Sequence, residues 1–326
     1  MVFEVDHADH LWKHAVKYTM MKGHEVLSRN GMSIEVLGPV YRVADITACF
    51  VFHPARKLKP EYAAGELLWY LSGSEDGEQI KGYAPSYDRF LNDGIAMGAY
   101  GKRWFDEGRI WNVIHDLRTK DNSRQAFLPF FEPKDVRRIT EGGYNDIPCT
   151  IGIQFIARDG YLHAICTMRS NDVWFGLPYD IFCFMMLQQM IADELGLRYG
   201  FYQHQPGSLH IYDKHMSKAK EINDQTLSYY GKTGASLDFD KTEAFSKGSL
   251  CVATLQEQLI RTQTNYHRHH DSIIDSFPKG SRLGFLLTLA LANFSRTTIS
   301  QEICAKFLPV ELSTHMMNCW MGGTNG

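Results

Sequence analysis

The segment Asp146–His215 constrains the fold of this chain more than any other, because its elements can be recognised one after another. Residues Cys149–Ile156 alternate apolar and polar side chains, which predicts a strand. The turn sequence Arg158–Tyr161 and a second alternating run, Leu162–Met168, then predict a β-hairpin. Residues Asp180–Leu195 are apolar nearly all round in their first half, which is typical of a core helix. The segment thus predicts two paired strands followed by a buried helix.

The chain is long enough to bury one large core, since it has 326 residues of which 44% are hydrophobic. We expect a single domain over residues 1–326, in which residues 216–326 form a divergent, mainly helical C-terminal part. The formal net charge of −3 indicates no broad basic surface, so we expect no nucleic-acid partner. Seven cysteines without CxxC pairs predict free thiols.

The N-terminus lacks the apolar core of a signal peptide, which predicts a cytoplasmic protein. The apolar run LGFLLTLALANF is shorter than the ~20 residues that a bilayer requires, so we expect no membrane partner. His267, His269 and His270 have no cysteine or carboxylate at a recognisable metal-binding spacing. We therefore expect a solvated helix end there and no metal site.

Two helices are expected before the central segment, at Leu11–Met21 and Lys59–Gly73. Pro60 at the start of the second helix and a glycine at its end are typical helix boundaries. Glu66 lies in the apolar body of this helix. It is either a buried carboxylate, which tends to hold a proton, or a surface residue at the helix edge.

A few side chains stand out as candidates for chemistry or anion binding. Cys149 follows a proline at the start of a strand, and it is either a nucleophile or a buried structural thiol. A nucleophilic thiolate needs a cationic setting, and arginine forks suit a phosphate. Arg169, in the strand-like run that continues from Met168, is a candidate for an anionic ligand. Arg29 precedes a strand and is either a residue of a phosphate-closing loop or an exposed hairpin arginine.

Six strings occur in an order and spacing that resemble the thymidylate synthase superfamily, over about residues 8–215. They are GELLWYLSG, GAYGKRW, NSRQ, PCTIGIQF, RSNDVWFGLPYDI and GSLHIY. No single string is decisive, but six in the same order argue strongly against chance. The resemblance implies an α/β (α+β) fold with a bent, mostly antiparallel sheet packed by helices, and a homodimer paired through the sheet face.

The resemblance also implies a catalytic set. Cys149 takes the place of the family's nucleophile, with Gln154 in the adjacent strand on the substrate side. Glu66 matches the catalytic glutamate and Tyr100 an active-site tyrosine. Trp104, in the same string as Tyr100, is expected to form part of an aromatic wall against the folate.

The remaining matched positions imply a nucleotide and folate site. Arg169 corresponds to a phosphate arginine, and Arg124 to an arginine that reaches across the dimer to the partner's phosphate. Ser170 contacts sugar or phosphate, and Asp172 contacts the folate. The substrate contacts are completed by Arg29 and by the pair that holds the ribose 3′-hydroxyl, His210 and Tyr212.

Asp180 is the departure that matters most, because thymidylate synthases have an asparagine at this position after Leu-Pro-Phe. An asparagine amide matches O4 and N3–H of uracil, whereas cytosine presents a 4-amino donor and an N3 acceptor. A carboxyl group accepts from the amino group, and a second bond forms if the carboxyl or N3 is protonated. Uracil would place O4 against the carboxylate. Asp180 therefore predicts a cytosine nucleotide, as in the cytidylate hydroxymethylases.

Three further departures concern the product and the anion contacts. The chain ends in NCWMGGTNG instead of a short apolar tail that closes over the folate. A less sealed site would let water capture the intermediate and give a hydroxymethyl product. Gln125 replaces a second arginine, so that Arg29 or Lys134 is expected to complete the phosphate clamp. Ser208 stands where the family usually has aspartate.

We therefore expect an enzyme that transfers a one-carbon unit from 5,10-methylenetetrahydrofolate to C5 of CMP or dCMP through a covalent bond from Cys149 to C6. Two alternatives remain at this point. One is a thymidylate synthase-like methylase of dCMP or dUMP. The other is a non-catalytic nucleotide-binding relative, against which the presence of Cys149, Glu66 and Asp180 together argues, because binding alone needs no nucleophile.

Overall fold

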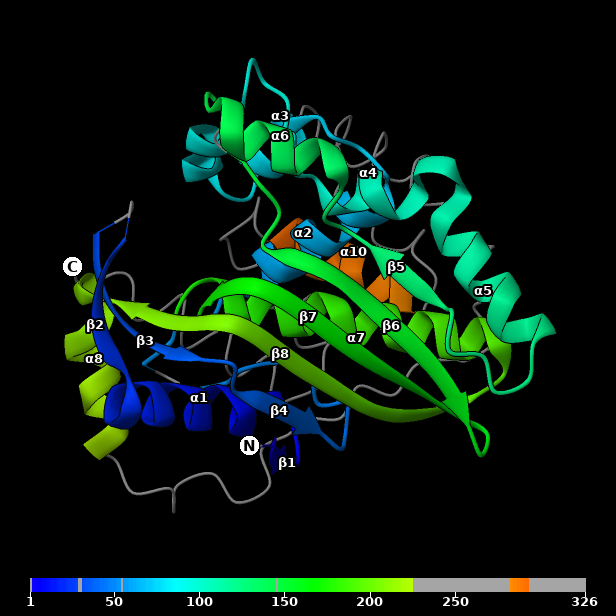
Figure 1. Cartoon of the computed structure of the whole chain (residues 1–326), viewed down its shortest axis with the longest axis horizontal. Helices are drawn as coiled ribbons and strands as arrows, with labels where there is room; N and C mark the ends of the chain where they lie inside the picture. The colour runs from blue at the N-terminus through cyan, green and yellow to red at the C-terminus, as the bar shows by residue number, and fades with distance from the viewer. Residues whose placement is uncertain (1, 29–30, 54, 145, 225–281, 293–326) are drawn as a thin grey trace.

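A computed structural model describes residues 2–28, 31–53, 55–144, 146–224 and 282–292, which form one sheet packed by helices (Figure 1). The strands are β1 (Val2–Val5), β2 (His24–Ser28), β3 (Gly31–Leu37), β4 (Val40–Val43), β5 (Phe127–Pro129), β6 (Thr150–Arg158), β7 (Tyr161–Asp172) and β8 (Arg198–Tyr212). The α-helices are α1 (Ala8–Lys22), α2 (Pro60–Leu71), α3 (Gly77–Lys81), α4 (Tyr100–Phe105), α5 (Arg109–Thr119), α6 (Pro133–Glu141), α7 (Gly176–Leu195), α8 (Asp213–Asp224) and α10 (Arg282–Ala292). Short 3₁₀ turns lie at Pro85–Phe90 and Asp106–Gly108.

The sheet runs in the order β1-β4-β8-β7-β6-β5, and β3 also pairs with β8 while β2 pairs with β3. Among these described strands five pairings are antiparallel and two, β1 with β4 and β7 with β8, are parallel. The connection between the parallel strands β7 and β8 contains α7, because neighbouring parallel strands need a long crossover segment. The expected mostly antiparallel sheet packed by helices is therefore confirmed.

The predicted hairpin is confirmed, since β6 ends at Arg158 and β7 begins at Tyr161. The two loop residues, Asp159 and Gly160, both have positive φ, at 51° and 76°. That conformation is the type I′ turn, whose twist matches the twist of the two strands. The hairpin fixes the register of β7, and thereby of the polar residues at its far end.

The core helix α7 begins at Gly176 rather than at Asp180, so the predicted boundary was wrong by one turn. Pro178 in the first turn has no N–H to leave unpaired, which permits the earlier start. The Asp172 carboxylate accepts hydrogen bonds from the backbone N–H groups of Trp174, at 2.7 Å, and Phe175, at 3.1 Å, just before the helix. As a result Asp180 lies inside the helix, on its second turn.

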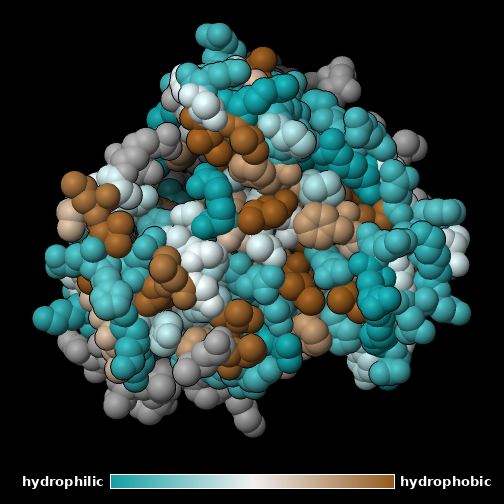
Figure 2. All heavy atoms as spheres, in the orientation of Figure 1, coloured by the Kyte–Doolittle hydropathy of each residue, from teal (hydrophilic) through white to brown (hydrophobic). Residues whose placement is uncertain are grey.

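The core lies between the sheet and the helices drawn behind it in Figure 1, chiefly α7 and α2. From Tyr161 to Met168 of β7 every second residue is buried and the alternate ones are partly exposed, so this part of the strand has one core face and one outer face. In Figure 1 no described helix crosses the outer face of β6, β7 and β8, and Figure 2 shows apolar side chains between polar ones on this side. Phe127 and Ile151 are exposed apolar residues of β5 and β6.

Helix α2 is buried along nearly its whole length, and α10 packs against it. Arg282 of α10 forms an ion pair of 2.8 Å with Asp193 of α7, and both side chains are almost fully buried. Because this pair is removed from water, it fixes α10 against α7 more firmly than a surface pair would. Part of the C-terminal region therefore belongs to the same core.

None of the helices in the described part of the chain is both long and apolar enough to cross a membrane.

Candidate active site

Cys149 lies immediately before β6 and is only partly exposed. Its backbone carbonyl accepts a hydrogen bond of 2.8 Å from the backbone N–H of Arg169 on the neighbouring strand. Burial raises the pKa of the Cys149 thiol, and the positive charge of Arg169 lowers it. The arginine is thus the group that favours the thiolate, which is the reactive form of a cysteine.

The Arg169 guanidinium is fixed by the chain just before the cysteine. Its Nε atom donates to the carbonyl of Pro148 at 2.9 Å, and Nη2 donates to the carbonyl of Ile147 at 3.0 Å. The residue is exposed, so the remaining N–H donors face solvent and can meet an anionic ligand. One side chain therefore both stabilises the thiolate and offers a phosphate contact.

Tyr100, at the start of α4, supports the residue that follows the cysteine. Its hydroxyl oxygen accepts from the backbone N–H of Thr150 at 3.2 Å and from the Thr150 hydroxyl at 3.0 Å. Burial raises the pKa of Tyr100, and the charges of Asp180 and Cys149 raise it further. A neutral tyrosine hydroxyl therefore lies within electrostatic reach of both groups.

Glu66 is 8% exposed, so the buried alternative is the one that the structure supports. Its Oε1 atom accepts a hydrogen bond of 2.9 Å from the hydroxyl of Tyr62, one turn earlier on α2. Burial raises the pKa of Glu66 to about 7, against the lowering effect of hydrogen bonds from Tyr62 and Tyr70. A carboxyl group with such a pKa can both give and accept a proton near neutral pH.

Asp180 projects from α7, and its residue surface is partly exposed. Burial of the carboxyl, followed by the charge of Glu66, raises its pKa to about 8, while a hydrogen bond from Asn171 lowers it. Asp180 in turn raises the pKa of Cys149. These mutual effects place the cysteine and the two carboxyl groups in one electrostatic cluster.

The parallel register of β7 and β8 brings the expected nucleotide residues together. Ser170 lies opposite Ser208, and Asp172 lies opposite His210. The ring of His210 lies 4.9 Å from the ring of Tyr212, edge to face. Burial lowers the pKa of His210, which leaves the imidazole neutral and able to hydrogen-bond a hydroxyl group.

Two of the expected residues pair with each other away from this cluster. The Gln154 side chain donates to the backbone carbonyl of Arg124 at 2.9 Å. Gln154 is five residues beyond Cys149 on β6, which corresponds to roughly 16 Å along a strand. The Arg124 side chain is exposed beside it. Within one subunit, therefore, no described contact joins Arg124 to the cysteine.

The structure places three other expected residues away from the cluster or outside the described chain. Trp104 is completely buried against Tyr70 and Phe130, at ring distances of 5.4 Å and 5.9 Å, so a folate could touch it only if this packing opened. Arg29 lies outside the described residues, as do His267, His269 and His270. Lys134 pairs with Glu132 at 2.6 Å.

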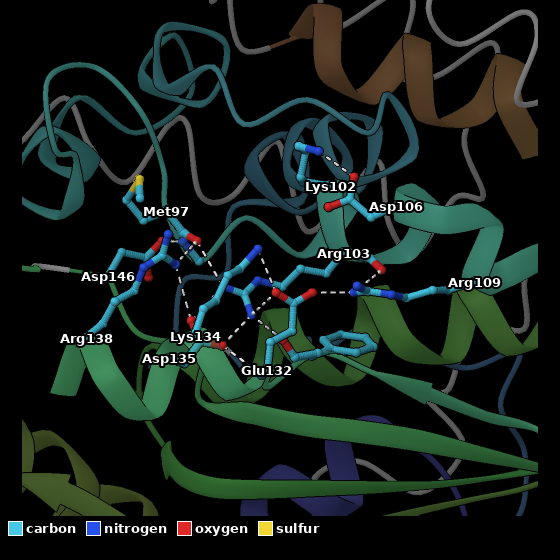
Figure 3. A network of polar contacts seen from close by, with 12 residues as sticks. Met97, Lys102, Arg103, Asp106, Arg109, Glu132, Lys134, Asp135, Arg138 and Asp146 are labelled. Carbon is cyan, nitrogen blue, oxygen red and sulfur yellow. Dashed lines mark hydrogen bonds and ion pairs between the residues drawn. The ribbon is translucent and has the colours of Figure 1, made fainter. Parts of the chain in front are cut away.

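A buried polar network supports the segment that leads to the cysteine (Figure 3). Arg103 of α4 binds both carboxylate oxygens of Asp135 in α6 and the carbonyl of Met97. Next to Met97, the backbone N–H of Gly98 donates to Asp146 at 3.0 Å. A Cβ atom at position 98 would lie 2.7 Å from that carboxylate, so only glycine allows this contact. The network thus connects two helices to the residues just before Cys149.

Arg56 is a site candidate that the sequence did not reveal. It is 7% exposed, and its Nε and Nη2 atoms have no hydrogen-bond partner within the described part of the chain. Its guanidinium lies over the ring of Tyr179, 5.2 Å from the ring centroid. Tyr179 is the residue before Asp180. A buried guanidinium with unused donors is suited to a carboxylate or phosphate. Arg56 lies beside Lys57 in the basic stretch HPARKLKP, so nothing in the sequence sets it apart from its neighbours.

The family comparison agrees with this arrangement of residues. A family model described as Thymidylate synthase matches residues 10–245, which is more than half of the chain. The matched range contains the cysteine, both carboxyl groups and the β7–β8 register described above. It ends before α10.

Proposed function

This chain belongs to the thymidylate synthase family, whose members transfer a one-carbon unit from methylenetetrahydrofolate to a pyrimidine nucleotide and work as dimers. From that premise we propose that it is a (deoxy)cytidylate 5-hydroxymethyltransferase. The observation that carries the proposal is Asp180, a carboxyl group in the cluster with Cys149 whose raised pKa, about 8, leaves it protonated at neutral pH.

The nucleophile of the proposed reaction is Cys149. Addition of its sulfur to C6 of the pyrimidine makes C5 electron-rich, and C5 can then form a bond to the one-carbon unit that methylenetetrahydrofolate supplies. Loss of the C5 proton and of tetrahydrofolate then leaves an exocyclic methylene on C5. Addition of a water oxygen to this carbon and departure of the sulfur from C6 restore the C5–C6 double bond. The lowering effect of Arg169 on the pKa of Cys149 supports this role, because the thiolate attacks.

Asp180 is the proposed contact to the base, and its preference for cytosine depends on which of its two oxygens carries the proton. A protonated carboxyl group offers one donor and one acceptor side by side, which matches the N3 acceptor and the 4-amino donor of cytosine. Glu66 supports the proposed hydroxymethyl product. Its pKa of about 7 allows it to take a proton from a water molecule, whose oxygen then completes the hydroxymethyl group on C5.

The remaining proposed contacts are distributed over β7, β8 and α7. Arg169 and Ser170 meet the phosphate or sugar, and the 3′-hydroxyl is held by His210 and Tyr212. Asp172 is the proposed contact to the folate. A folate carries carboxylates, and the unpaired donors of Arg56 fit such a group.

We also propose that the active unit is a homodimer paired through the outer face of the sheet. That face carries the exposed Phe127 and Ile151, and it is not covered by a described helix. The exposed Arg124 lies at the same part of the sheet, next to β5 and β6, where it can reach a partner's phosphate. An interface of this kind would explain why no described contact joins Arg124 to Cys149 of its own subunit.

The test is to incubate the protein with methylenetetrahydrofolate and dCMP, CMP or dUMP, and to identify each product by mass. A 5-hydroxymethyl product from dCMP or CMP, absent with Cys149→Ala, is the expected result. A methyl product with a rise in absorbance from dihydrofolate would show a methylase instead. Binding without any product would show a non-catalytic relative. The rates on CMP and dCMP side by side identify the preferred sugar.

A further inference from the structure

A chain of buried hydrogen bonds ends on the Asp180 carboxyl group. Asn171 Nδ2 donates to Asp180 Oδ2 at 2.7 Å. Asn171 Oδ1 lies 3.0 Å from His204 Nε2, and His204 Nδ1 lies 2.9 Å from the hydroxyl of Tyr202. Asn171 is 3% exposed, and both His204 and Tyr202 are fully buried. We call this chain of hydrogen bonds, from Tyr202 through His204 and Asn171 to Asp180, the relay. The burial of its first three residues isolates their donors and acceptors from water.

The relay has one direction. Burial lowers the pKa of His204 to about 3, so the imidazole is neutral and has a single N–H. An amide oxygen only accepts, so Nε2 of His204 must donate to Asn171 and Nδ1 must accept from the Tyr202 hydroxyl. The amide of Asn171 then turns its NH₂ group to Asp180. In such a buried network each bond fixes the next, because an unpaired group would be costly.

A neutral carboxyl group alone does not distinguish cytosine from uracil. With its proton on one oxygen it pairs with the N3 acceptor and 4-amino donor of cytosine. With its proton on the other oxygen it pairs equally well with N3–H and O4 of uracil. Proton transfer between the two oxygens costs little. Since Asp180 is protonated near neutral pH, its base preference requires something that assigns the proton to one oxygen.

We propose that Asn171, oriented by His204, determines base specificity by assigning the donor and acceptor oxygens of Asp180. The N–H of Asn171 occupies a lone pair of Oδ2, which keeps Oδ2 as the acceptor for the 4-amino group and leaves the proton on Oδ1 as the donor to N3. This inference rests on the proposed cytidylate activity. Asn171 and His204 act through Asp180 and are positioning residues.

Gly176 supplies an independent observation at the same point. A Cβ atom there would lie 3.0 Å from Asn171 Nδ2 and 3.2 Å from Asp180 Oδ2, closer than side chains normally pack. The φ angle of Gly176 is not positive, so the backbone itself does not require glycine. The absence of a side chain therefore leaves room for the amide–carboxyl bond.

The experiment measures the dissociation constants of dCMP and dUMP by titration calorimetry at pH 7, and compares their ratio among variants. Asn171→Leu removes the donor while nearly keeping the volume, and His204→Leu removes the group that orients it. We expect the preference for dCMP to fall at least tenfold in both, mainly through tighter dUMP binding. In His204→Gln an amide N–H can still donate to Asn171, so we expect this variant to keep most of the preference.

Gln188→Leu is the matched control, because Gln188 is also a fully buried amide that bonds strands β7 and β8, through the carbonyls of Leu162, Gly200 and Phe201. It should lower the melting temperature without changing the ratio. If Asn171→Leu does not fold, the His204→Leu and His204→Gln pair decides. An unchanged ratio in His204→Leu and any folded Asn171→Leu overturns the inference. A wild-type protein that prefers dUMP overturns the proposed function instead, whatever the variants do.

Discussion

The Nε atom of Arg169 donates a hydrogen bond of 2.9 Å to the carbonyl oxygen of Pro148, the residue before the cysteine. This bond holds a positive charge where it lowers the pKa of Cys149. We expect Arg169→Gln to raise that pKa and to slow alkylation by iodoacetamide at pH 8 by roughly threefold to tenfold. Cys149→Ser identifies the signal of this thiol. Arg198→Gln, at the start of β8, serves as the control, and an equal loss there would argue against a local effect.

Asp180→Asn should keep the preference for dCMP as long as Asn171 is present. The N–H of Asn171 would hold the amide oxygen of residue 180 toward the 4-amino group and leave the NH₂ group as the donor to N3. The double variant Asp180→Asn with Asn171→Leu should instead prefer dUMP by roughly tenfold or more, because the amide can then turn and pair with O4 and N3–H of uracil. Titration calorimetry with both nucleotides measures the change, and the exposed Asp213→Asn is the control. If the single variant already preferred dUMP, Asn171 would not set the orientation of this side chain.

The sequence predicted the elements that have a strong local pattern. The β6–β7 hairpin was expected from alternation and from the turn residues Asp159 and Gly160, whose positive φ angles the structure shows. The start of α7 was predicted four residues too late, although Asp172 gives a local signal just before the helix by accepting hydrogen bonds from the N–H groups of Trp174 and Phe175. The buried position of Glu66 was one of two alternatives that periodicity alone left open.

The relay to Asp180 could not be predicted from the sequence. Asn171 and His204 are 33 residues apart, and they meet on the neighbouring parallel strands β7 and β8. Asn171 lies between Ser170 and Asp172, which were matched to functional positions of the family, whereas Asn171 itself was assigned no role from the sequence. The complete burial of Trp104 was missed for a similar reason, since its packing against Tyr70 and Phe130 joins three segments.

The ion pair between Arg103 and Asp135 should contribute strongly to folding, because both side chains are almost completely buried. Arg103→Met would leave a buried carboxylate whose one remaining cationic partner among the described residues is Arg138, and we expect a loss of about 3–5 kcal/mol in urea unfolding. The double variant Arg103→Met with Asp135→Leu should lose less than the sum of the single variants. Lys81→Met, which breaks only exposed pairs among the described residues, should change stability far less. Additive losses would show that the two buried residues act independently.

Mixed dimers test whether Arg124 acts on the partner's site. Neither Cys149→Ser nor Arg124→Ala should be active alone. A refolded equal mixture should recover about a quarter of the wild-type rate, because half of the dimers then contain one intact site of two. The measurement is the rate of product formation after mixing and refolding. If the mixture stayed inactive while each variant still formed dimers, Arg124 would serve its own subunit, and activity of Arg124→Ala alone would show that it serves neither site.

Glu66 should make the folded state less stable as the pH rises. Its pKa is about 7 in the folded protein against an ordinary value of 4.5, so the folded state keeps a proton that the unfolded chain loses. The stability that this proton provides is complete below pH 4.5 and is lost as the pH rises through 7, by at most roughly 3 kcal/mol. Asp180 acts in the same direction up to about pH 8. Urea unfolding at pH 5 and pH 8 should therefore show a smaller difference for Glu66→Gln than for wild type. The exposed Glu141→Gln should keep the wild-type difference, and an identical difference in both variants would contradict the assignment, because a neutral glutamine has no proton to lose.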